Sequence, residues 1–525
     1  MKTAAALVAA LALPALAIPG GKDHGKDHGK DHGKDHGKGH DKNHGFPPRC
    51  KEFVTSKKLQ KAINIDSLLA GSQRLQDIAD ANDGTRAFGG TGHNATVDFL
   101  IDSLSGLDYY DITKQAFTET YATADGSLTV DGAEVPAGPM TYTPSGDVSA
   151  PLVVVSNLGC EASDYPAELA GNIALISRGE CTFGAKSISA KAAGAVGAII
   201  YNNEAGSLSG TLGGAGEDYA PVVGISKEDA EPILAALEAG EVTADLKIDS
   251  TVEERVTFNV IAETKGGDHD NVLVLGGHTD SVADGPGIND DGSGTIGVLR
   301  VAQALAKYKV KNAVRFGFWS AEEFGLLGSA AYVDSFQNDT VELSKMRAYL
   351  NFDMIASPNF IYGIYDGDGS AFNMSGPPGS DAIEKEFEDF YTRNGAKFVP
   401  SEFDGRSDYE AFILNGIPAG GLFTGAEGIM TEEEAEMFGG QAGVAYDVNY
   451  HAAGDDINNL SNEAFLLNTK SIANSVAKYA MSFDSLEPVD LAKRSAAAAR
   501  ARVTRRSKVH THKHNSPCGG SRLAV

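Results

Sequence analysis

The 525-residue sequence has few cysteines, no long apolar segment and no excess of basic charge. Its 44 Lys and Arg residues stand against 71 Asp and Glu residues, which gives a formal net charge of −27. Proteins that bind a nucleic-acid duplex need a basic surface, so this balance argues against nucleic acid as a partner. After the N-terminus no apolar run approaches about 18 residues, the usual length of a membrane-spanning helix. We therefore expect a soluble protein, and a monomer, with no membrane partner.

The first residues are typical of a secretory signal peptide. Met1 and Lys2 precede an apolar run at residues 4–13, and Ala-Leu-Ala at residues 15–17 resembles a cleavage site. We therefore expect a signal peptide at residues 1–17 and a secreted protein, with the vacuolar lumen as the alternative. Four Asn-X-Ser/Thr tripeptides, potential glycosylation sites on that route, begin at Asn94, Asn338, Asn373 and Asn459.

The four cysteines fit an oxidising compartment. Cys160 and Cys181 lie in one short segment, and we expect a disulfide between them. Cys50 and Cys518 lie near opposite ends of the mature chain and form a possible second pair.

Composition divides the chain into distinct segments. Residues 18–45 form a low-complexity Lys, Asp, His and Gly tract whose composition excludes a packed core, and residues 491–525 form a basic tail with nine Lys or Arg and no acidic residue. Residues 256–483 alternate β runs with amphipathic helices, the pattern of a mostly parallel α/β sheet flanked by helices, whereas residues 53–143 mix helical and strand patterns. Residues 144–246 contain Gly-rich turns and short β runs, which predict a β-rich segment.

Outside the tract and the tail the chain has only four histidines. His93 lies in a polar, Gly-rich stretch and His269 in a turn before a strand, and we expect both at the surface. His278 follows a predicted strand, so its imidazole lies where open α/β sheets place their sites. Asp280 is expected to hold the second ring nitrogen of His278, an arrangement found around metal ions.

Acidic side chains follow the loop and the strands downstream of His278. A tight acidic loop that contains Asp290 and Asp291 precedes a helix predicted at residues 295–305. Capping of that helix is a sufficient alternative role for these two aspartates. Two adjacent glutamates end the strand at residues 313–319, and they are costly to bury without a counter-charge. Two divalent metal ions would supply that charge, and this mixture of His and carboxylates suits zinc. The candidate ligands and their neighbours are His278, Asp290, Asp291, Glu322, Glu323, Asp353 and His451.

The motifs at these positions resemble those of the co-catalytic di-zinc aminopeptidases, a family that includes secreted fungal leucine aminopeptidases and vacuolar aminopeptidase Y. The motifs are His-Thr-Asp-Ser from residue 278, Gly-Ile-Asn-Asp-Asp-Gly-Ser-Gly from 287, Ser-Ala-Glu-Glu-Phe-Gly from 320, Asn-Phe-Asp-Met from 351 and Tyr-His from 450. The resemblance extends from residue 53 to residue 483. It implies that residues 46–143 and 247–490 form one peptidase domain into which residues 144–246 are inserted. The segment at 144–246 resembles a protease-associated domain, whose role as a lid or size filter is a hypothesis.

The resemblance implies two zinc ions per chain. It assigns His278 and Asp353 to one ion. Glu323 and His451 belong to the other, and Asp290 bridges both. It also implies that the peptide bond following Asp290 is cis.

Further roles come from the same resemblance. Glu322 is implied to be the general acid/base that takes a proton from the metal-activated water. Tyr450 resembles a tyrosine that hydrogen-bonds the developing oxyanion, although a structural role is an alternative. Arg406 is a candidate for the substrate pocket, and Ser407 is a plausible N-cap for a helix at 408–414.

These observations predict a secreted zinc aminopeptidase. Its substrates would be peptides with a free N-terminus, from which it removes large apolar, Leu-like residues. An apolar run at residues 417–424 is expected to form one wall of the site. A carboxypeptidase and a non-catalytic receptor-like protein on the same fold stay open as alternatives.

Overall fold

The computed structural model describes residues 51–216, 218–336, 339–488 and 496. The predicted signal peptide, the low-complexity tract, nearly all of the basic tail, the Cys50–Cys518 pair and the sequon at Asn338 lie outside these residues. Within the described part of the chain, no helix is both long enough and apolar enough to cross a membrane.

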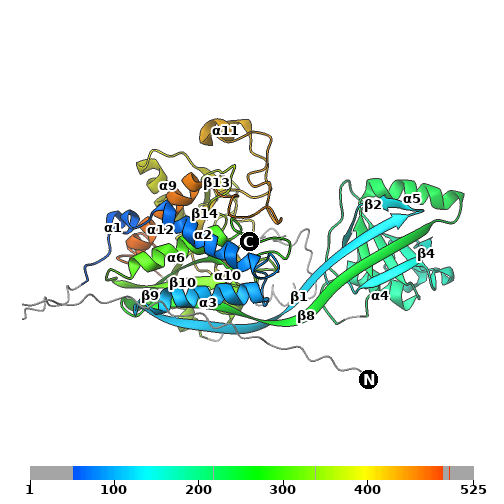
Figure 1. Ribbon diagram of the computed structural model, residues 1–525, viewed down its shortest axis with the longest axis horizontal. Helices are drawn as coiled ribbons and strands as arrows, with labels where there is room; N and C mark the ends of the chain where they lie inside the picture. Colours follow the sequence, from blue (N-terminus) through cyan, green and yellow to red (C-terminus); the bar gives the residue numbers. More distant parts are fainter. Residues whose placement is uncertain (1–50, 217, 337–338, 489–495, 497–525) are drawn as a thin grey trace, which may run out of the picture. The chain divides into compact units, whose positions relative to one another are not determined.

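A largely parallel sheet forms the centre of the peptidase-like part (Figure 1). Its strand order is β13-β12-β14-β11-β9-β10-β8, with β9 parallel to both β10 and β11. The antiparallel pairs are β10 with β8 and β12 with β14. The strands are β8 (Thr243–Thr264), β9 (Asp268–His278), β10 (Asn312–Trp319), β11 (Met346–Phe352), β12 (Gly363–Tyr365), β13 (Val399–Ser401) and β14 (Ala419–Phe423).

Helices cover both faces of this sheet, and the strand sequences explain why. Along β9, Leu273 and Leu275 pack in one core while Val272 and Val274 pack in another, because successive side chains point to opposite faces. The first core is completed by α1 (Ser56–Lys61), α2 (Ile65–Asp80), α3 (Thr91–Ser105), α6 (Gly292–Leu305), α9 (Ser380–Arg393) and α12 (Asn462–Tyr479). The second is completed by α7 (Leu327–Asp334), α8 (Thr340–Lys345) and α10 (Tyr409–Leu414). A further helix, α11 (Glu432–Phe438), lies in the loop between β14 and α12.

The inserted segment has its own hydrophobic cores, while its strands continue the sheet through the antiparallel pairing of β4 with β8. It is connected through β1 (Tyr110–Val130), which pairs with β8 in antiparallel fashion along its whole length. Strands β4, β5, β6 and β7 are parallel neighbours, and α4 and α5 accompany them, so the insert is mixed α/β in detail. Its elements are β2 (Ala133–Val135), β3 (Ala137–Pro139), β4 (Gly146–Val154), the 3₁₀ turns η1 (Ala162–Asp164) and η2 (Ala167–Leu169), β5 (Ile173–Ser177), α4 (Phe183–Ala192), β6 (Gly197–Tyr201), β7 (Val222–Ile225) and α5 (Lys227–Ala239).

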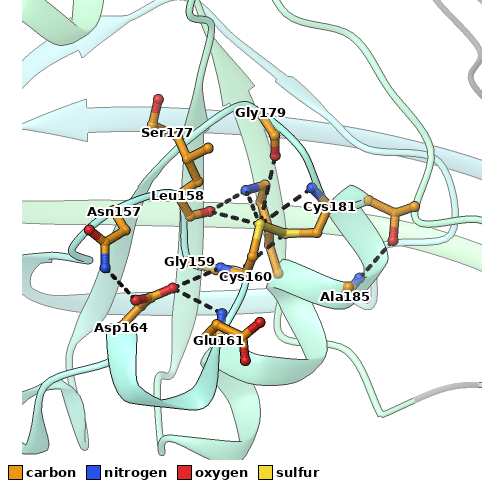
Figure 2. The surroundings of a disulfide bond; sticks show 12 residues. Asn157, Leu158, Gly159, Cys160, Glu161, Asp164, Ser177, Gly179, Cys181 and Ala185 are labelled. Carbon is orange, nitrogen blue, oxygen red and sulfur yellow. Dashed lines mark hydrogen bonds between the residues drawn. A yellow bond between two sulfur atoms is a disulfide. The ribbon is translucent and has the colours of Figure 1, made fainter.

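The predicted disulfide between Cys160 and Cys181 is present in this insert (Figure 2). Next to it, Asp164 accepts hydrogen bonds from the backbone nitrogen of Cys160 (3.1 Å) and from the side-chain nitrogen of Asn157 (2.6 Å). The buried Lys186 donates to the carbonyl oxygen of Leu158. The bridge therefore closes a loop whose polar groups are satisfied from within the loop and from α4.

Candidate metal centre

The candidate side chains meet because three parallel strands end at one edge of the sheet. His278 is the last residue of β9 and lies opposite Trp319, the last residue of β10. Glu322 and Glu323 follow β10, and Asp353 follows β11 directly. The carboxyl ends of parallel strands share an edge, which brings residues more than 70 positions apart into one cluster.

The carboxylate of Asp290 lies between two imidazoles. Its Oδ1 is 3.1 Å from Nε2 of His278, and its Oδ2 is 3.3 Å from Nε2 of His451. Two ligand atoms of one tetrahedral zinc ion lie about 3.3 Å apart when each bond is about 2.0 Å long. Each histidine–aspartate pair therefore has the separation that one shared ion would require.

Two more carboxylates divide between these histidines. Oδ1 of Asp353 lies 3.5 Å from Nε2 of His278 and is a buried oxygen without a hydrogen bond in the described part of the chain. Oε2 of Glu323 lies 2.9 Å from Nε2 of His451. After Asp290, the nearest carboxylate to Nε2 of His278 is thus Asp353, whereas Glu323 is the nearest carboxylate to Nε2 of His451.

The protonation of His278 also suits metal binding. Its Nδ1 lies 3.2 Å from the backbone carbonyl oxygen of Asp280, which can only accept a hydrogen bond, so Nδ1 is the donor. In the neutral ring the lone pair is then on Nε2, which faces Asp290 and Asp353. A cation between these groups would fit the donor set.

The Asp280 carboxylate lies beside Nδ1 of His278, the position expected from the sequence. Its Oδ1 is 3.7 Å from that nitrogen, farther than the backbone oxygen of the same residue, and it also accepts a hydrogen bond of 3.1 Å from the backbone nitrogen of Glu322. Asp280 therefore connects the end of β9 to the turn after β10, while its backbone oxygen orients the imidazole.

The electrostatics of the cluster indicate excess negative charge. Burial lowers the pKa of His278, but the charges of Glu322 and Asp353 outweigh it and raise that pKa well above its usual value. Burial likewise lowers the pKa of His451, and Glu323 with Asp290 raises it to about 10. The carboxylates of the cluster thus favour a positive charge at both imidazoles, and bound metal ions would supply that charge in place of protons.

Asp291 has a different role from its neighbour. Its Oδ1 accepts hydrogen bonds from the backbone nitrogens of Gly294 (2.8 Å) and Met354 (3.0 Å), and its Oδ2 accepts one from His278 (3.2 Å). This carboxylate caps α6 and ties the helix to two strand ends, so capping explains Asp291 although it does not explain Asp290. The peptide bond between Asp290 and Asp291 is cis, as the resemblance implied.

Glu322 lies beside the cluster without a close histidine. Its side chain is buried, and the nearest imidazole nitrogen, Nε2 of His278, is 3.8 Å from Oε2. Burial raises the pKa of the Glu322 carboxyl well above its usual value, although the charge of His278 opposes the shift. A carboxyl with a raised pKa beside a candidate metal cluster is suited to accept a proton and return it.

A pocket opens beside the cluster. Arg406 donates to both carboxylate oxygens of Glu427 (2.9 and 3.3 Å) and to the hydroxyl oxygen of Tyr450 (3.2 Å), and the Tyr450 ring stacks on His451. The structure thus places Tyr450 and Arg406, the candidates for oxyanion and substrate binding, in the lining of this pocket. Its lining residues are Asp290, Glu322, Glu323, Asp353, Met354, Tyr365, Ser401, Glu402, Asp404, Arg406, Ser407, Phe423, Ala426 and Tyr450.

Ser407 is not the helix cap that the sequence predicted. Asp408 is the residue that precedes α10, and its side chain makes no capping hydrogen bond. The Ser407 hydroxyl donates to Oδ2 of Asp353 (2.6 Å) and accepts from the side chain of Asn351 (2.8 Å). It therefore orients a candidate ligand.

The prediction that His93 lies at the surface is wrong, whereas His269 is exposed as expected. His93 is fully buried on α3, with Nε2 2.9 Å from the hydroxyl of Thr279 and Nδ1 3.3 Å from that of Thr257. Burial lowers the pKa of His93 to about 4, so this imidazole is neutral at physiological pH. It packs behind the loop that carries His278.

Sequence reasoning also missed Arg86, whose side chain is fully buried. Its guanidinium donates to the carbonyl oxygens of Thr279, Pro286 (2.8 Å) and Gly287 (2.5 Å). Arg86 therefore joins the loop after His278 to the loop before Asp290. Nothing in the local sequence marks this arginine, because its acceptors are backbone groups about 200 residues away.

The sequon at Asn459 is not compatible with a glycan in the folded chain. The side chain is 4% exposed, and its amide nitrogen donates to Asp447 (2.9 Å) and Asp455 (3.0 Å). By contrast, Asn373 is exposed.

Comparison with known proteins identifies the family. The model of peptidase family M28 matches residues 259–476, and that of the PA domain matches residues 148–233. A probable leucine aminopeptidase 2 from Aspergillus fumigatus is 55% identical, over 89% of this chain and 93% of that protein. Leucine aminopeptidase 2 from Arthroderma otae is 52% identical, over 82% and 87% of the two chains.

Solved structures agree with this. An aminopeptidase from Aneurinibacillus sp. strain AM-1 aligns with a TM-score of 0.63 at 28% identity, covering 83% of this chain and 97% of that one. A zinc aminopeptidase from Bacillus subtilis aligns with a TM-score of 0.56 at 25% identity, covering 81% of this chain and 94% of that one.

The predicted fold, an α/β sheet flanked by helices with an inserted protease-associated domain, is confirmed. The carboxypeptidase and receptor-like alternatives receive no support from these relatives. The chain belongs to peptidase family M28, carries a PA domain, and is a metallo-aminopeptidase.

Proposed function

We propose that this metallo-aminopeptidase is a secreted, zinc-dependent enzyme that removes large apolar, Leu-like residues from the N-terminus of peptides. Its relatives are named leucine aminopeptidases, and one similar structure is named a zinc aminopeptidase. The N-terminal sequence pattern supports secretion, with the vacuolar lumen as the alternative. The proposal includes a monomeric enzyme and the domain limits predicted above, within which both family matches lie.

The proposal includes two zinc ions per chain. His278 and Asp353 would hold one ion, and Glu323 and His451 the other. The observation that carries this proposal is the position of Asp290, whose two oxygens lie 3.1 and 3.3 Å from different imidazoles. A carboxylate that faces two histidines with separate oxygens is suited to bridge two ions.

Zinc, when bound, would supply Lewis acidity for the attacking water and the scissile carbonyl. Glu322 would take the proton from that water and return it to the leaving amine, because burial raises the pKa of its carboxyl and so increases its basicity. Tyr450 would donate a hydrogen bond from its hydroxyl group to the oxyanion that develops as the carbonyl is attacked. Arg406, which Glu427 and Tyr450 hold in place, would fix the substrate backbone beside these groups.

The apolar preference rests on the pocket wall. Met354, Tyr365, Phe423 and Ala426 line the pocket next to the candidate ligands. Phe423 is the last residue of β14, and Ala426 follows that strand. The strand β14 lies in the apolar run at residues 417–424, which the sequence predicted to form one wall of the site. A branched apolar side chain would bury its surface there when the substrate binds.

Hydrolysis of leucine p-nitroanilide, compared with its N-acetylated analogue, tests the proposal. We expect cleavage of the free-amine substrate alone, loss of activity on chelation, and recovery when zinc is returned, with about two zinc ions per chain by elemental analysis. Cleavage of the acetylated substrate at a similar rate would refute the aminopeptidase assignment for this pocket. One tightly bound ion in the fully active enzyme would refute the bridging role of Asp290.

A further inference from the structure

The turn that carries Glu322 and Glu323 has a strained backbone. Ala321 and Leu326, on either side of it, have φ angles of 57° and 60°, in the left-handed region that residues other than glycine seldom adopt. The backbone nitrogens of Gly325 (2.9 Å) and Leu326 (2.8 Å) donate to the carbonyl oxygen of Glu322 and close the turn. Because a strained conformation persists only where its surroundings enforce it, we expect contacts from outside the turn to hold it.

An aromatic cluster supplies such contacts. The ring centroid of Phe324, the residue after Glu323, lies 4.8 Å from that of Phe88, edge to face, and 5.2 Å from that of Tyr121. Phe88 and Tyr121 are both buried and meet edge to face at 5.5 Å. The buried Ala321 belongs to the same cluster. Aromatic pairs at these separations attract one another beyond the burial of their surface, so two rings from outside hold the turn at Phe324.

Tyr121 is itself held in place. It lies on β1, and the guanidinium carbon of Arg255, on the paired strand β8, is 3.3 Å from the centroid of its ring. Arg255 also donates to the carbonyl oxygen of Phe88 (3.3 Å), and it packs so closely that a Cβ atom at Gly89 would lie 2.6 Å from its own Cβ. The strands that fix the turn are also those that carry the insert, because β4 pairs with β8.

We propose that Tyr121 is a positioning residue for the proton-transfer step. Its ring, together with that of Phe88, clamps Phe324 and so keeps Glu322 in the place from which it serves the reaction. The inference rests on the proposed function, in which Glu322 is the acid/base. Among the described residues, those that line the pocket do not include Tyr121, so its effect reaches the substrate through the turn.

The kinetic test compares Tyr121→Leu, which removes the ring but keeps an apolar side chain, with Tyr121→Phe, which keeps the ring. With leucine p-nitroanilide as substrate and zinc content matched, Tyr121→Leu should lower kcat by about 10- to 100-fold, because a displacement of about 1 Å at a reacting group has effects of that size. KM should stay within about twofold, since the substrate pocket is left in place. Tyr121→Phe should keep kcat within about twofold of the wild type.

Amide hydrogen exchange measures the turn directly and does not depend on activity. In Tyr121→Leu the amides of residues 325–327, which bond within the turn, should exchange at least about 10-fold faster, while those of β9 should not change. Phe258→Leu is the matched control, because Phe258 is a partly buried ring on β8 that packs against the first core and lies outside the aromatic cluster. It should change neither kcat nor the exchange of residues 325–327 by more than about twofold.

An unchanged kcat in Tyr121→Leu, with or without faster exchange, would overturn the positioning role while sustaining the proposed function. Equal losses in Tyr121→Leu and Phe258→Leu would show general destabilisation and would also overturn it. A loss of kcat in Tyr121→Phe as large as that in Tyr121→Leu would overturn the clamp, because the ring would then not be the feature that matters. If the wild type does not cleave leucine p-nitroanilide, the proposed function itself fails, and the exchange of residues 325–327 still decides whether Tyr121 holds the turn.

Discussion

The backbone nitrogen of Asp290 donates a hydrogen bond of 3.0 Å to Oδ2 of the buried Asp455. The other oxygen of Asp455 accepts from the backbone nitrogen of Asn289 (2.8 Å) and from the side chain of Asn459 (3.0 Å). Asp455 therefore holds the turn that carries Asp290, the residue proposed to bridge both ions. Metal sites depend on such outer partners because a ligand that is free to rotate binds less tightly.

We predict that Asp455→Ala lowers zinc affinity by about 10- to 100-fold, because the turn carrying Asp290 loses its two side-chain acceptors. Competition between the protein and a coloured chelator would measure the affinity. Asp484→Ala, which removes an exposed carboxylate after α12, is the control. An affinity for Asp455→Ala within twofold of the control would contradict the positioning role.

Replacement of Glu322 should separate catalysis from metal binding. We expect Glu322→Gln to lower kcat by at least about 100-fold, because the amide cannot take the proton of the attacking water. Zinc content should match that of the wild type, since Glu322 is not among the five proposed ligands. Elemental analysis and steady-state kinetics on one preparation would measure both quantities. Loss of zinc in parallel with activity would instead make Glu322 a ligand.

The pH dependence of stability provides a test away from the metal centre. Burial raises the pKa of Glu384, on α9, to about 7, and the charges of Asp368 and Asp366 add to that shift. The fold therefore favours the protonated form of Glu384. The contribution of this residue to the free energy of unfolding is fully present below the unfolded pKa of about 4.3, and it is lost as pH rises through about 7. Above that pH the buried charge should cost about 1–3 kcal/mol of unfolding free energy.

Glu384→Gln should accordingly stabilise the protein at pH 8 and have little effect at pH 5. The glutamine oxygen can still accept from the backbone nitrogens of Gly367 and Asp368, which now bond to Oε2 of Glu384. Urea denaturation at both pH values would measure the difference. Glu436→Gln, which removes an exposed carboxylate on α11, is the charge-matched control. A stabilisation that is equal at the two pH values would contradict the shifted pKa.

The strand ends made most of the candidate metal centre predictable. His278, Glu323 and Asp353 each follow an apolar β run, and parallel strands deliver the residues after them to a common edge whatever the loops do. His93 was misplaced because its neighbours in the sequence are small and polar, while its burial depends on Thr279, 186 residues away. The role of Asp455 was not predicted for a related reason. Its carboxylate oxygens accept hydrogen bonds from backbone nitrogens of a turn remote in the sequence, and no residue type in the sequence marks such backbone partners.

The disulfide of the insert offers a stability prediction of its own. Cys160 and Cys181 are 21 positions apart. A disulfide that closes a loop of that size restricts the unfolded chain and so raises the free energy of unfolding by about 3 kcal/mol. We expect the double variant Cys160→Ser/Cys181→Ser to unfold at lower urea concentration and to be cleaved sooner by protease within residues 148–233. Zinc content should not change, because the proposed ligands all lie outside this segment. Equal protease resistance would show that the bridge adds no stability.

Glycosylation should distinguish two sequons that look alike in the sequence. Asn373 is exposed after β12, whereas the amide of Asn459 is engaged by Asp447 and Asp455. We therefore expect a glycan on Asn373 and none on Asn459 when the protein is secreted from a eukaryotic host. Glycosidase treatment in heavy-oxygen water followed by peptide mass analysis would mark each formerly modified asparagine. The variant Asn373→Gln should lose the mass of one glycan, which gives a control for site assignment. A modified Asn459 in active enzyme would contradict the hydrogen-bonded network around Asp455, since a glycosylated amide nitrogen cannot make both contacts.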